Sequence, residues 1–147
     1  MELRVDARPV FVATGGQTPR PEQPTVVFIH GSGMDHTVWT LQSRYFAHHG
    51  RNVLAVDLPG HGRSDGPALR GIGALADWIV RLLDAAGVEK SALVGHSLGA
   101  LVALEAAARA PARIWAVALL GVAERLAVHP DLLKAAEAGE HAAIDLV

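Results

Sequence analysis

Apolar positions along the chain follow two alternating patterns, short uninterrupted runs and longer segments with helical spacing. A strand buried on both faces gives an uninterrupted run, whereas a helix with one buried face repeats its apolar residues every three or four positions. The runs cover residues 25–29, 52–56, 92–94 and 114–120. The helical spacing covers residues 38–49, 75–86 and 98–110. This alternation predicts an α/β protein with a mostly parallel, doubly wound sheet and helices on both faces.

Further segments flank these elements. Near the amino terminus, residues 3–5 and 10–13 look like the two strands of a short β-hairpin, which we place at an edge of the sheet. Three prolines between residues 17 and 24 then predict an exposed, extended connection. At the other end of the chain, residues 130–138 have helical spacing again. We therefore expect a hairpin, then four buried strands alternating with helices, then a further helical segment.

Composition narrows the possible functions. Half of the 147 residues are hydrophobic, 19% are charged, and the formal net charge is −2. Such a chain has no basic surface for nucleic acid and suits a small, uncharged or weakly charged partner. Cysteine is absent, which removes disulfides, thiolate metal sites and cysteine catalysis. The sequence predicts a soluble, cytoplasmic protein without a signal peptide or a membrane-spanning segment.

The strongest chemical signal is the sequence Gly95-His96-Ser97-Leu98-Gly99, which fits the pattern G-x-S-x-G. It lies where an apolar run ends and a helical segment begins, so it places a serine in a sharp turn from strand to helix. Side chains at Gly95 and Gly99 would collide with the neighbouring strand or helix. The serine itself would be strained, with its hydroxyl exposed above the sheet. The pattern therefore predicts a nucleophile at Ser97.

Two other loops follow apolar runs earlier in the chain. Residues 30–33, His-Gly-Ser-Gly, follow the run at 25–29, and the Gly- and Pro-rich residues 57–66 follow the run at 52–56. The carboxyl ends of parallel strands share one edge of a sheet, and ligands bind there in open α/β sheets. We therefore expect these two loops and the serine turn to meet at one site.

Together the three loops resemble those of the α/β-hydrolase superfamily. The sequence has, in order, a His-Gly loop at 30–33, an Asp-Leu-Pro-Gly-His-Gly-Arg-Ser motif at 57–64, and the nucleophile elbow at 95–99. The resemblance covers roughly residues 1 to 125 in order and spacing. It implies an α/β-hydrolase sheet, of which about six of eight strands are present here.

The resemblance also implies a role for each part of the site. Ser97 would attack an acyl carbon and form an acyl-enzyme. The backbone N–H of Leu98 and a second N–H, for which Ser32 is the candidate with Gly33 close behind it, would form the oxyanion hole. The glycines that would shape these loops are Gly31, Gly95 and Gly99. The expected partner is a small acyl substrate, with no cofactor, metal, nucleic acid or membrane, and the oligomeric state stays open.

Several residues of these loops have a simpler explanation than catalysis. Ser97 could instead cap the helix that follows it, but this would leave both elbow glycines unexplained. His30 and His61 are each followed by Gly in a tight loop, and we interpret them as residues that shape the loops. Asp57 precedes the serine, whereas the superfamily places its acid after the serine. We expect Asp57 to organise its loop by binding loop amides or Arg63.

The acid and the histidine that would activate Ser97 are not recognisable after it. Each would follow a later strand, but only one further apolar run, residues 114–120, remains. The later acids and histidines are Glu105, Glu124, His129, Asp131, Glu137, Glu140, His141 and Asp145. We therefore assign residues 1–123 to the N-terminal part of an α/β-hydrolase core and residues 124–147 to the start of a helical cap. On this interpretation the chain is the N-terminal portion of a longer hydrolase.

The function expected from these features is that of a serine hydrolase acting on a small carboxylic ester or a related acyl compound. Carbon–carbon bond hydrolysis, lactone opening, acyl transfer and cofactor-free peroxidation reuse the same elbow and are alternatives within the superfamily. A non-catalytic pseudoenzyme or binding module is the alternative from a different class. The intact elbow argues against that last alternative.

We predict that the 147-residue chain, expressed alone, is poorly soluble and nearly inactive. A serine without its base is a weak nucleophile, and only substrate binding and the oxyanion hole would remain. Hydrolysis of a short-chain aryl ester measures this, and the rate should stay close to that of a Ser97→Ala variant. Robust turnover that Ser97→Ala abolishes would contradict the prediction and would point to His129 or His141 as the base.

Overall fold

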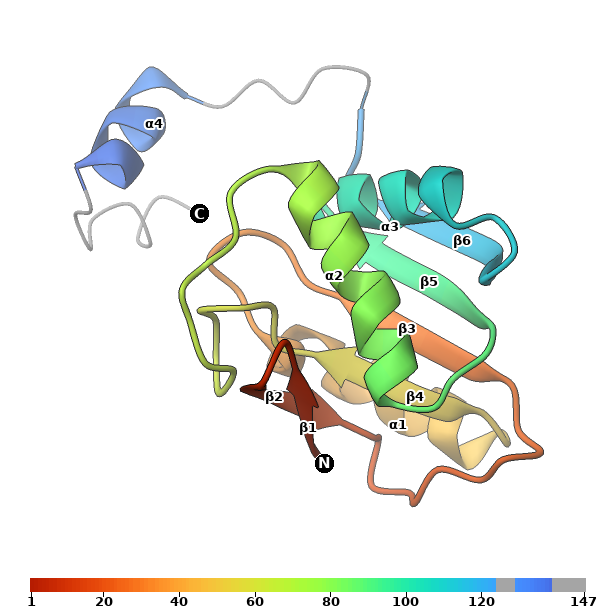
Figure 1. Cartoon of the computed structure of the whole chain (residues 1–147). Helices are drawn as coiled ribbons and strands as arrows, with labels where there is room; N and C mark the ends of the chain where they lie inside the picture. Colours follow the sequence, from red (N-terminus) through yellow and green to blue (C-terminus); the bar gives the residue numbers. More distant parts are fainter. Residues whose placement is uncertain (124–128, 139–147) are drawn as a thin grey trace.

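A computed structural model describes residues 1–123 and 129–138 of the chain. Its elements appear in the predicted order, a hairpin followed by alternating strands and helices (Figure 1). The strands are β1 (Glu2–Val5), β2 (Arg8–Ala13), β3 (Thr25–Ile29), β4 (Asn52–Val56), β5 (Ser91–His96) and β6 (Ile114–Leu120). The helices are the 3-10 helix η1 (His36–Trp39), α1 (Thr40–His48), α2 (Ile72–Ala85), α3 (Leu98–Arg109) and α4 (Pro130–Glu137).

The six strands form one sheet in the order β1-β2-β4-β3-β5-β6. β2 is antiparallel to β1 and to β4, whereas β4, β3, β5 and β6 run parallel to one another. The chain passes from β3 to β4 on one side and then crosses to β5 on the other side of β3. Ligands bind outside the carboxyl ends of the strands at such a switch point. The fold is the predicted mostly parallel α/β sheet.

Helices cover both faces of this sheet, α1 on one face and α2 with α3 on the other (Figure 1). All residues of β3 and β4 are buried, as their uninterrupted apolar runs predict. Because successive side chains of a strand point to opposite faces, Val27 and Ile29 pack toward α2 and α3, whereas Val26 and Phe28 pack toward α1. The ring centroid of Phe28 lies 5.2 Å from that of Trp39. Burying a side chain of this size contributes about 1.5–3 kcal/mol to stability.

The helix predicted over residues 38–49 is α-helical only from Thr40, because the chain before it forms the 3-10 helix η1. Asp35 caps this turn, because its Oδ1 accepts hydrogen bonds from the Thr37 N–H at 2.8 Å and from the Thr37 hydroxyl at 2.5 Å. These two bonds, the hydroxyl bond first, lower the pKa of Asp35 below its usual value. The α-helical part ends near Gly50, whose φ of +73° is the left-handed conformation expected of a glycine at this position.

One strand does not have the environment that its sequence predicts. The run at 114–120 does form β6, but only Ile114 is buried, whereas the pattern indicates a strand covered on both faces. Among the described residues β6 lies at the edge of the sheet, with β5 as its one neighbouring strand. Trp115 is 56% exposed and Val117 is 40% exposed. An apolar run identifies a strand but does not identify the element that covers it.

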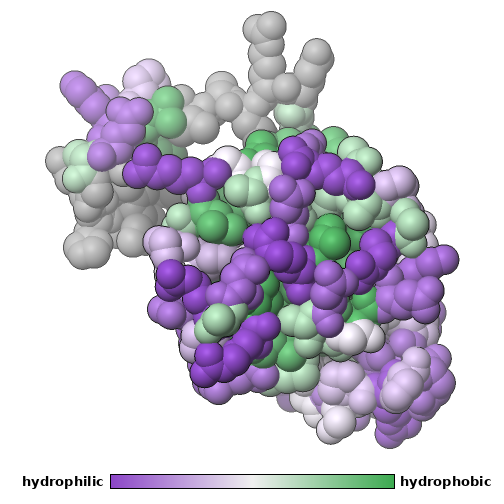
Figure 2. Space-filling model, in the orientation of Figure 1, coloured by the Kyte–Doolittle hydropathy of each residue, from purple (hydrophilic) through white to green (hydrophobic). Residues whose placement is uncertain are grey.

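The surface over α2 and α3 is largely hydrophilic (Figure 2). Figure 2 shows the face that carries α2 and α3, where hydrophilic side chains predominate around smaller hydrophobic areas. No helix within residues 1–123 and 129–138 has the length and apolar character needed to cross a membrane. The helix predicted over 130–138 is α4, whereas residues 124–128 and 139–147 of the expected cap lie outside the described residues.

Candidate active site

Ser97 occupies the turn between β5 and α3, with φ 53° and ψ −117°. A positive φ in a residue with a side chain costs about 1–3 kcal/mol and persists only where the surroundings impose it. Here the Ser97 N–H donates to the Leu120 carbonyl at 2.9 Å, and the Ser97 carbonyl accepts from the Ala100 N–H at 3.0 Å. The Ser97 side chain makes no capping hydrogen bond to α3, so the helix-cap interpretation is wrong. The strained serine predicted from the sequence is confirmed.

The two elbow glycines are required by close backbone packing. A Cβ atom on Gly95 would fall on the carbonyl oxygen of Gly99 in the first turn of α3. A Cβ atom on Gly99 would fall on the carbonyl oxygen of Ile29 and lie 2.6 Å from that of His30, at the end of β3. Real Cβ atoms do not approach backbone so closely, so both predicted collisions are confirmed. The first turn of α3 therefore rests directly on the end of β3.

This packing brings the elbow next to the His-Gly loop. A Cβ atom on Gly31 would lie 3.4 Å from the Ser97 Cβ and 3.2 Å from Nδ1 of His96. Any side chain at position 31 would therefore press on the turn that holds the serine, and Gly31 leaves that space free. The sequence prediction that the loops after β3 and β5 meet is confirmed at this point.

The predicted oxyanion-hole residues, Leu98 and Ser32, each have a backbone N–H without a hydrogen-bond partner in the described part of the chain. Leu98 is the first residue of α3, so its N–H has no partner within the helix, and the helix N-terminus favours an anion. In the loop, the turn over residues 31–34 is closed by the Met34 N–H, which donates to the Gly31 carbonyl at 3.3 Å. The Ser32 N–H donates to no other group in the described part of the chain. Ser32 and Leu98 stay the predicted oxyanion-hole residues.

Asp57 directly follows β4 and organises the third loop from a fully buried position. Its Oδ1 accepts from the His36 N–H at 2.7 Å and lies 2.8 Å from Nδ1 of the same residue. Its Oδ2 accepts from the Arg63 N–H at 2.9 Å, while the Arg63 guanidinium lies 3.8 Å above the Phe11 ring. The prediction that Asp57 binds loop amides is confirmed. Its histidine partner was not predicted, because no motif links residues 36 and 57.

His30 couples the loop after β3 to the loop after β4. Its Nδ1–H donates to the Gly31 carbonyl at 2.7 Å, and its Nε2 accepts from the Leu58 N–H at 3.0 Å. These two partners require the neutral imidazole, and burial lowers the pKa of His30. The His61 ring lies 5.2 Å away, with its Nδ1 3.1 Å from the Pro59 carbonyl. Both histidines shape loops, as predicted.

One group of side chains in this region has the composition of a metal site. The potential ligand atoms of Asp35, His36 and Asp57 lie within 4.8 Å of one another. However, Asp57 Oδ1 and His36 Nδ1 already bind each other, and Asp35 Oδ1 already accepts two bonds from Thr37. We therefore interpret these atoms as part of the hydrogen-bond network that holds the loops.

A hollow of about 550 Å³ adjoins the His-Gly loop at the carboxyl edge of the sheet. It lies between that loop with η1 and the loop after β4, and is lined by Gly33, Met34, Asp35, Thr37, Val38, Gly60, His61 and Gly62. Met34 also lies beside Gly31, with its Sδ 3.3 Å from a Cβ built there. This hollow lies at the same edge of the sheet as Ser97, and its lining comes from the loops after β3 and β4 and not from the elbow.

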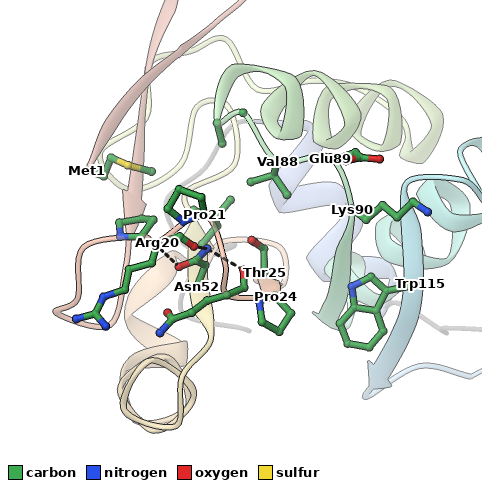
Figure 3. A pocket seen from close by; sticks show the side chains of 15 residues that line it. Met1, Arg20, Pro21, Pro24, Thr25, Asn52, Val88, Glu89, Lys90 and Trp115 are labelled. Atoms are coloured by element: carbon green, nitrogen blue, oxygen red, sulfur yellow. Dashed lines mark hydrogen bonds between the residues drawn. The ribbon is translucent and has the colours of Figure 1, made fainter.

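A hollow of about 680 Å³ lies at the opposite edge of the sheet, where the strands begin (Figure 3). Thr25 at the start of β3 and Trp115 on β6 are among its lining residues. Asn52 there holds the proline-rich connection, because its Oδ1 accepts from the Arg20 N–H at 2.8 Å. No elbow or loop residue discussed above lines this hollow, so its larger volume does not make it the active site.

The sequence of the chain is similar to those of known proteins. The chain matches the sequence model of the alpha/beta hydrolase fold over residues 24–141. It is 42% identical over 98 residues to the dihydrolipoyllysine-residue acetyltransferase component of the acetoin cleaving system of Cupriavidus necator, covering 65% of this chain and 26% of that protein. It is 36% identical over 130 residues to the pimeloyl-(acyl-carrier protein) methyl ester esterase of Methylococcus capsulatus, covering 82% of this chain and 44% of that protein.

A solved structure of a thermophilic esterase superposes on the chain with a TM-score of 0.78 and 32% identity. The superposition covers 99% of this chain and 53% of the esterase. The chain thus spans 26% and 44% of the two curated relatives and 53% of the solved structure.

The neutral, buried His30 predicts a pH dependence of stability. In the unfolded chain this histidine takes up a proton near pH 6.5, whereas in the folded protein its pKa is lower. Below pH 6.5 the unfolded state therefore binds more protons, and the free energy of unfolding falls as the pH falls toward the folded pKa. The loss approaches at most about 1.4 kcal/mol per pH unit for one proton, and above this window the contribution is constant.

Urea unfolding of the wild type and a His30→Gln variant at pH values on both sides of this window measures the effect. The variant should be less stable at neutral pH and should lose less stability on acidification. His49→Gln, at an exposed histidine after α1, is the matched control and should leave the slope unchanged. Equal slopes for the wild type and His30→Gln would show that His30 does not stay neutral.

Proposed function

Because this chain belongs to the alpha/beta hydrolase fold family, whose members include esterases and other hydrolases, we propose that it carries the nucleophile of a serine hydrolase. The proposed nucleophile is Ser97, and the proposed substrate is a small carboxylic ester or a related acyl compound. The observation that carries the proposal is the conformation of Ser97, a non-glycine residue at φ 53° between two glycines that no other residue could replace. Such strain is characteristic of a residue held for function.

In the proposed reaction, Ser97 Oγ attacks the acyl carbon, and the carbonyl oxygen becomes an oxyanion. The N–H groups of Leu98 and Ser32 would donate to this oxyanion, and the helix N-terminus adds a favourable partial charge. Collapse of the intermediate expels the alcohol and leaves the acyl group on Ser97, and water then hydrolyses this ester. A base must take the Oγ proton and return it to the leaving alcohol.

His30 and His36, from the two neighbouring loops, do not fit the role of this base. His30 has one ring nitrogen donating to a carbonyl and the other accepting from an amide. His36 has its Nδ1 bound to the buried carboxylate of Asp57. Within residues 1–123 and 129–138 no histidine or carboxylate is hydrogen-bonded to Ser97 Oγ, which supports the weak activity expected of this chain.

Acyl transfer is the second candidate, because a curated relative is named an acetyltransferase component. It would use the same acyl-enzyme, with an alcohol or a thiol in place of water as the acceptor. The elbow and the oxyanion hole would serve both reactions in the same way. Product analysis with and without an added acceptor alcohol distinguishes the two.

We predict that a fluorophosphonate probe labels Ser97 of the 147-residue chain slowly, and faster when imidazole is added. Imidazole can take the Oγ proton, and the elbow exposes this hydroxyl while the oxyanion hole binds the phosphonyl oxygen. Peptide mapping by mass spectrometry measures the site and the rate. Labelling should be absent in Ser97→Ala.

Ser32→Ala is the matched control for this experiment. The proposal uses the backbone N–H of Ser32 and not its hydroxyl, so this variant should label as fast as the wild type. The remaining serines, Ser43, Ser64 and Ser91, are buried and should stay unlabelled. A label on another serine, or no imidazole-dependent label at all, would exclude Ser97 as the nucleophile.

A further inference from the structure

A third hollow, of about 690 Å³, lies on the face of the sheet covered by α1. It is enclosed by the turn that follows β2, by His36 at the start of η1, and by one side of α1. Its lining residues are Ala13, Thr14, Gly15, Gly16, Gln17, His36, Thr40, Ser43, Arg44 and His48. β4 and β3 separate the β2 edge from β5, so this hollow is distinct from the site at Ser97.

One face of α1 supplies basic side chains to this hollow. Thr40, Arg44 and His48 are spaced four residues apart, so they follow one another along the same side of the helix. All three line the hollow, whereas the neighbouring His49 does not and instead places its Nδ1 2.7 Å from the Tyr45 carbonyl. The four-residue spacing therefore puts His48 on the side of α1 that lines the hollow and leaves His49 outside it.

The charges around the hollow have one sign. Its titratable lining residues are Arg44, His36 and His48, and no carboxylate is among them. Arg44 makes no ion pair or side-chain hydrogen bond with the described residues, which leaves its planar array of N–H donors available. Two carboxylates lie close to His36 without lining the hollow. Asp57 is fully buried and bound to His36 and to the Arg63 amide, and Asp35 accepts two hydrogen bonds from Thr37.

His36 is fixed at one end of the hollow by this buried carboxylate. Its Nδ1 lies 2.8 Å from Asp57 Oδ1, and its ring centroid lies 4.7 Å from that of Phe11. Nδ1 is therefore occupied, and Nε2 is the ring nitrogen left for a ligand. In the protonated ring, Nε2–H is a donor for an anion.

The turn after β2 closes the other side and lies directly on α1. Gly15 has φ +66°, and a Cβ atom there would fall on the Ser43 carbonyl oxygen and lie 2.8 Å from the Ala47 Cβ. Gly16 has φ +82°, and a Cβ atom there would meet nothing within 4 Å. The turn is thus pressed against the helix at Gly15 and open at Gly16, where a side chain could enter the space beside it.

We propose that this hollow binds a small organic or inorganic oxyanion, with a phosphoryl or carboxylate group as the recognised part. Arg44 would supply the permanent charge and a fork of donors that matches either group. His48 and the Nε2 edge of His36 would add donors when protonated. The Thr40 hydroxyl donates to the Thr37 carbonyl and the Ser43 hydroxyl to the Thr40 carbonyl. Both hydroxyl protons are therefore already used, and Arg44 is the main donor left for the anion.

Calorimetric titration of the 147-residue chain with inorganic phosphate and with acetate tests the proposal, using a carrier-protein fusion with the carrier alone as blank. Saturable binding of either anion, weakened by added salt, supports it, and the preferred anion identifies the recognised group. Arg44→Gln should weaken binding by about tenfold or more, since it removes a charge-assisted donor pair. Arg51→Gln, outside the hollow, is the matched control and should bind like the wild type.

Substitution at Gly16 provides a test with a built-in folding control. Asn and Asp both tolerate the left-handed conformation at this position, and they differ only in charge. Gly16→Asp should abolish binding by placing a carboxylate beside the hollow, whereas Gly16→Asn should retain most of it. The absence of saturable binding by both anions, or equal affinity of the wild type, Arg44→Gln and Gly16→Asp, would overturn the proposal.

Discussion

The contact between the first turn of α3 and the end of β3 is the constraint on which the candidate active site depends. The backbone of Gly99 lies so close to the carbonyl oxygens of Ile29 and His30 that no side chain fits between them. Gly95 is pressed in the same way against the first turn of α3. With helix and strand this close, the connecting residue cannot relax, and Ser97 is held at a positive φ. The same contact fixes its distance from the His-Gly loop.

Buried hydrogen bonds then hold the neighbouring loops in register with this turn. His30 joins the loop after β3 to Leu58 in the loop after β4, and Asp57 gathers the amides of His36 and Arg63. The His30 ring and the Asp57 carboxylate have no access to water, so a lost bond to either leaves an unsatisfied group that costs about 1–3 kcal/mol. The loops are therefore positioned by the core of the protein, and the proposed oxyanion-hole residues Ser32 and Leu98 belong to segments held in this way.

Much of this arrangement could be predicted from the sequence, because it follows from local rules. Uninterrupted and helical apolar spacing identified the elements, and the glycines of the elbow predicted the collisions that the backbone shows. Features that depend on tertiary neighbours could not be predicted. The exposure of β6 depends on what covers the strand, which its own sequence does not state. Three further features join segments that no motif connects: the hydrogen bond from Ser97 to Leu120, the pairing of His36 with Asp57, and the basic hollow beside α1.

A diffraction structure of the chain carrying a phosphonyl group on Ser97 tests the central claim most directly. If the elbow is a nucleophile site with a preformed oxyanion hole, the phosphorus will be bonded to Ser97 Oγ, with the positive φ retained. Its phosphonyl oxygen will then lie about 2.7–3.1 Å from the backbone nitrogens of Leu98 and Ser32. A phosphonyl oxygen directed away from both nitrogens, or a Ser97 backbone relaxed to a negative φ, would contradict the account.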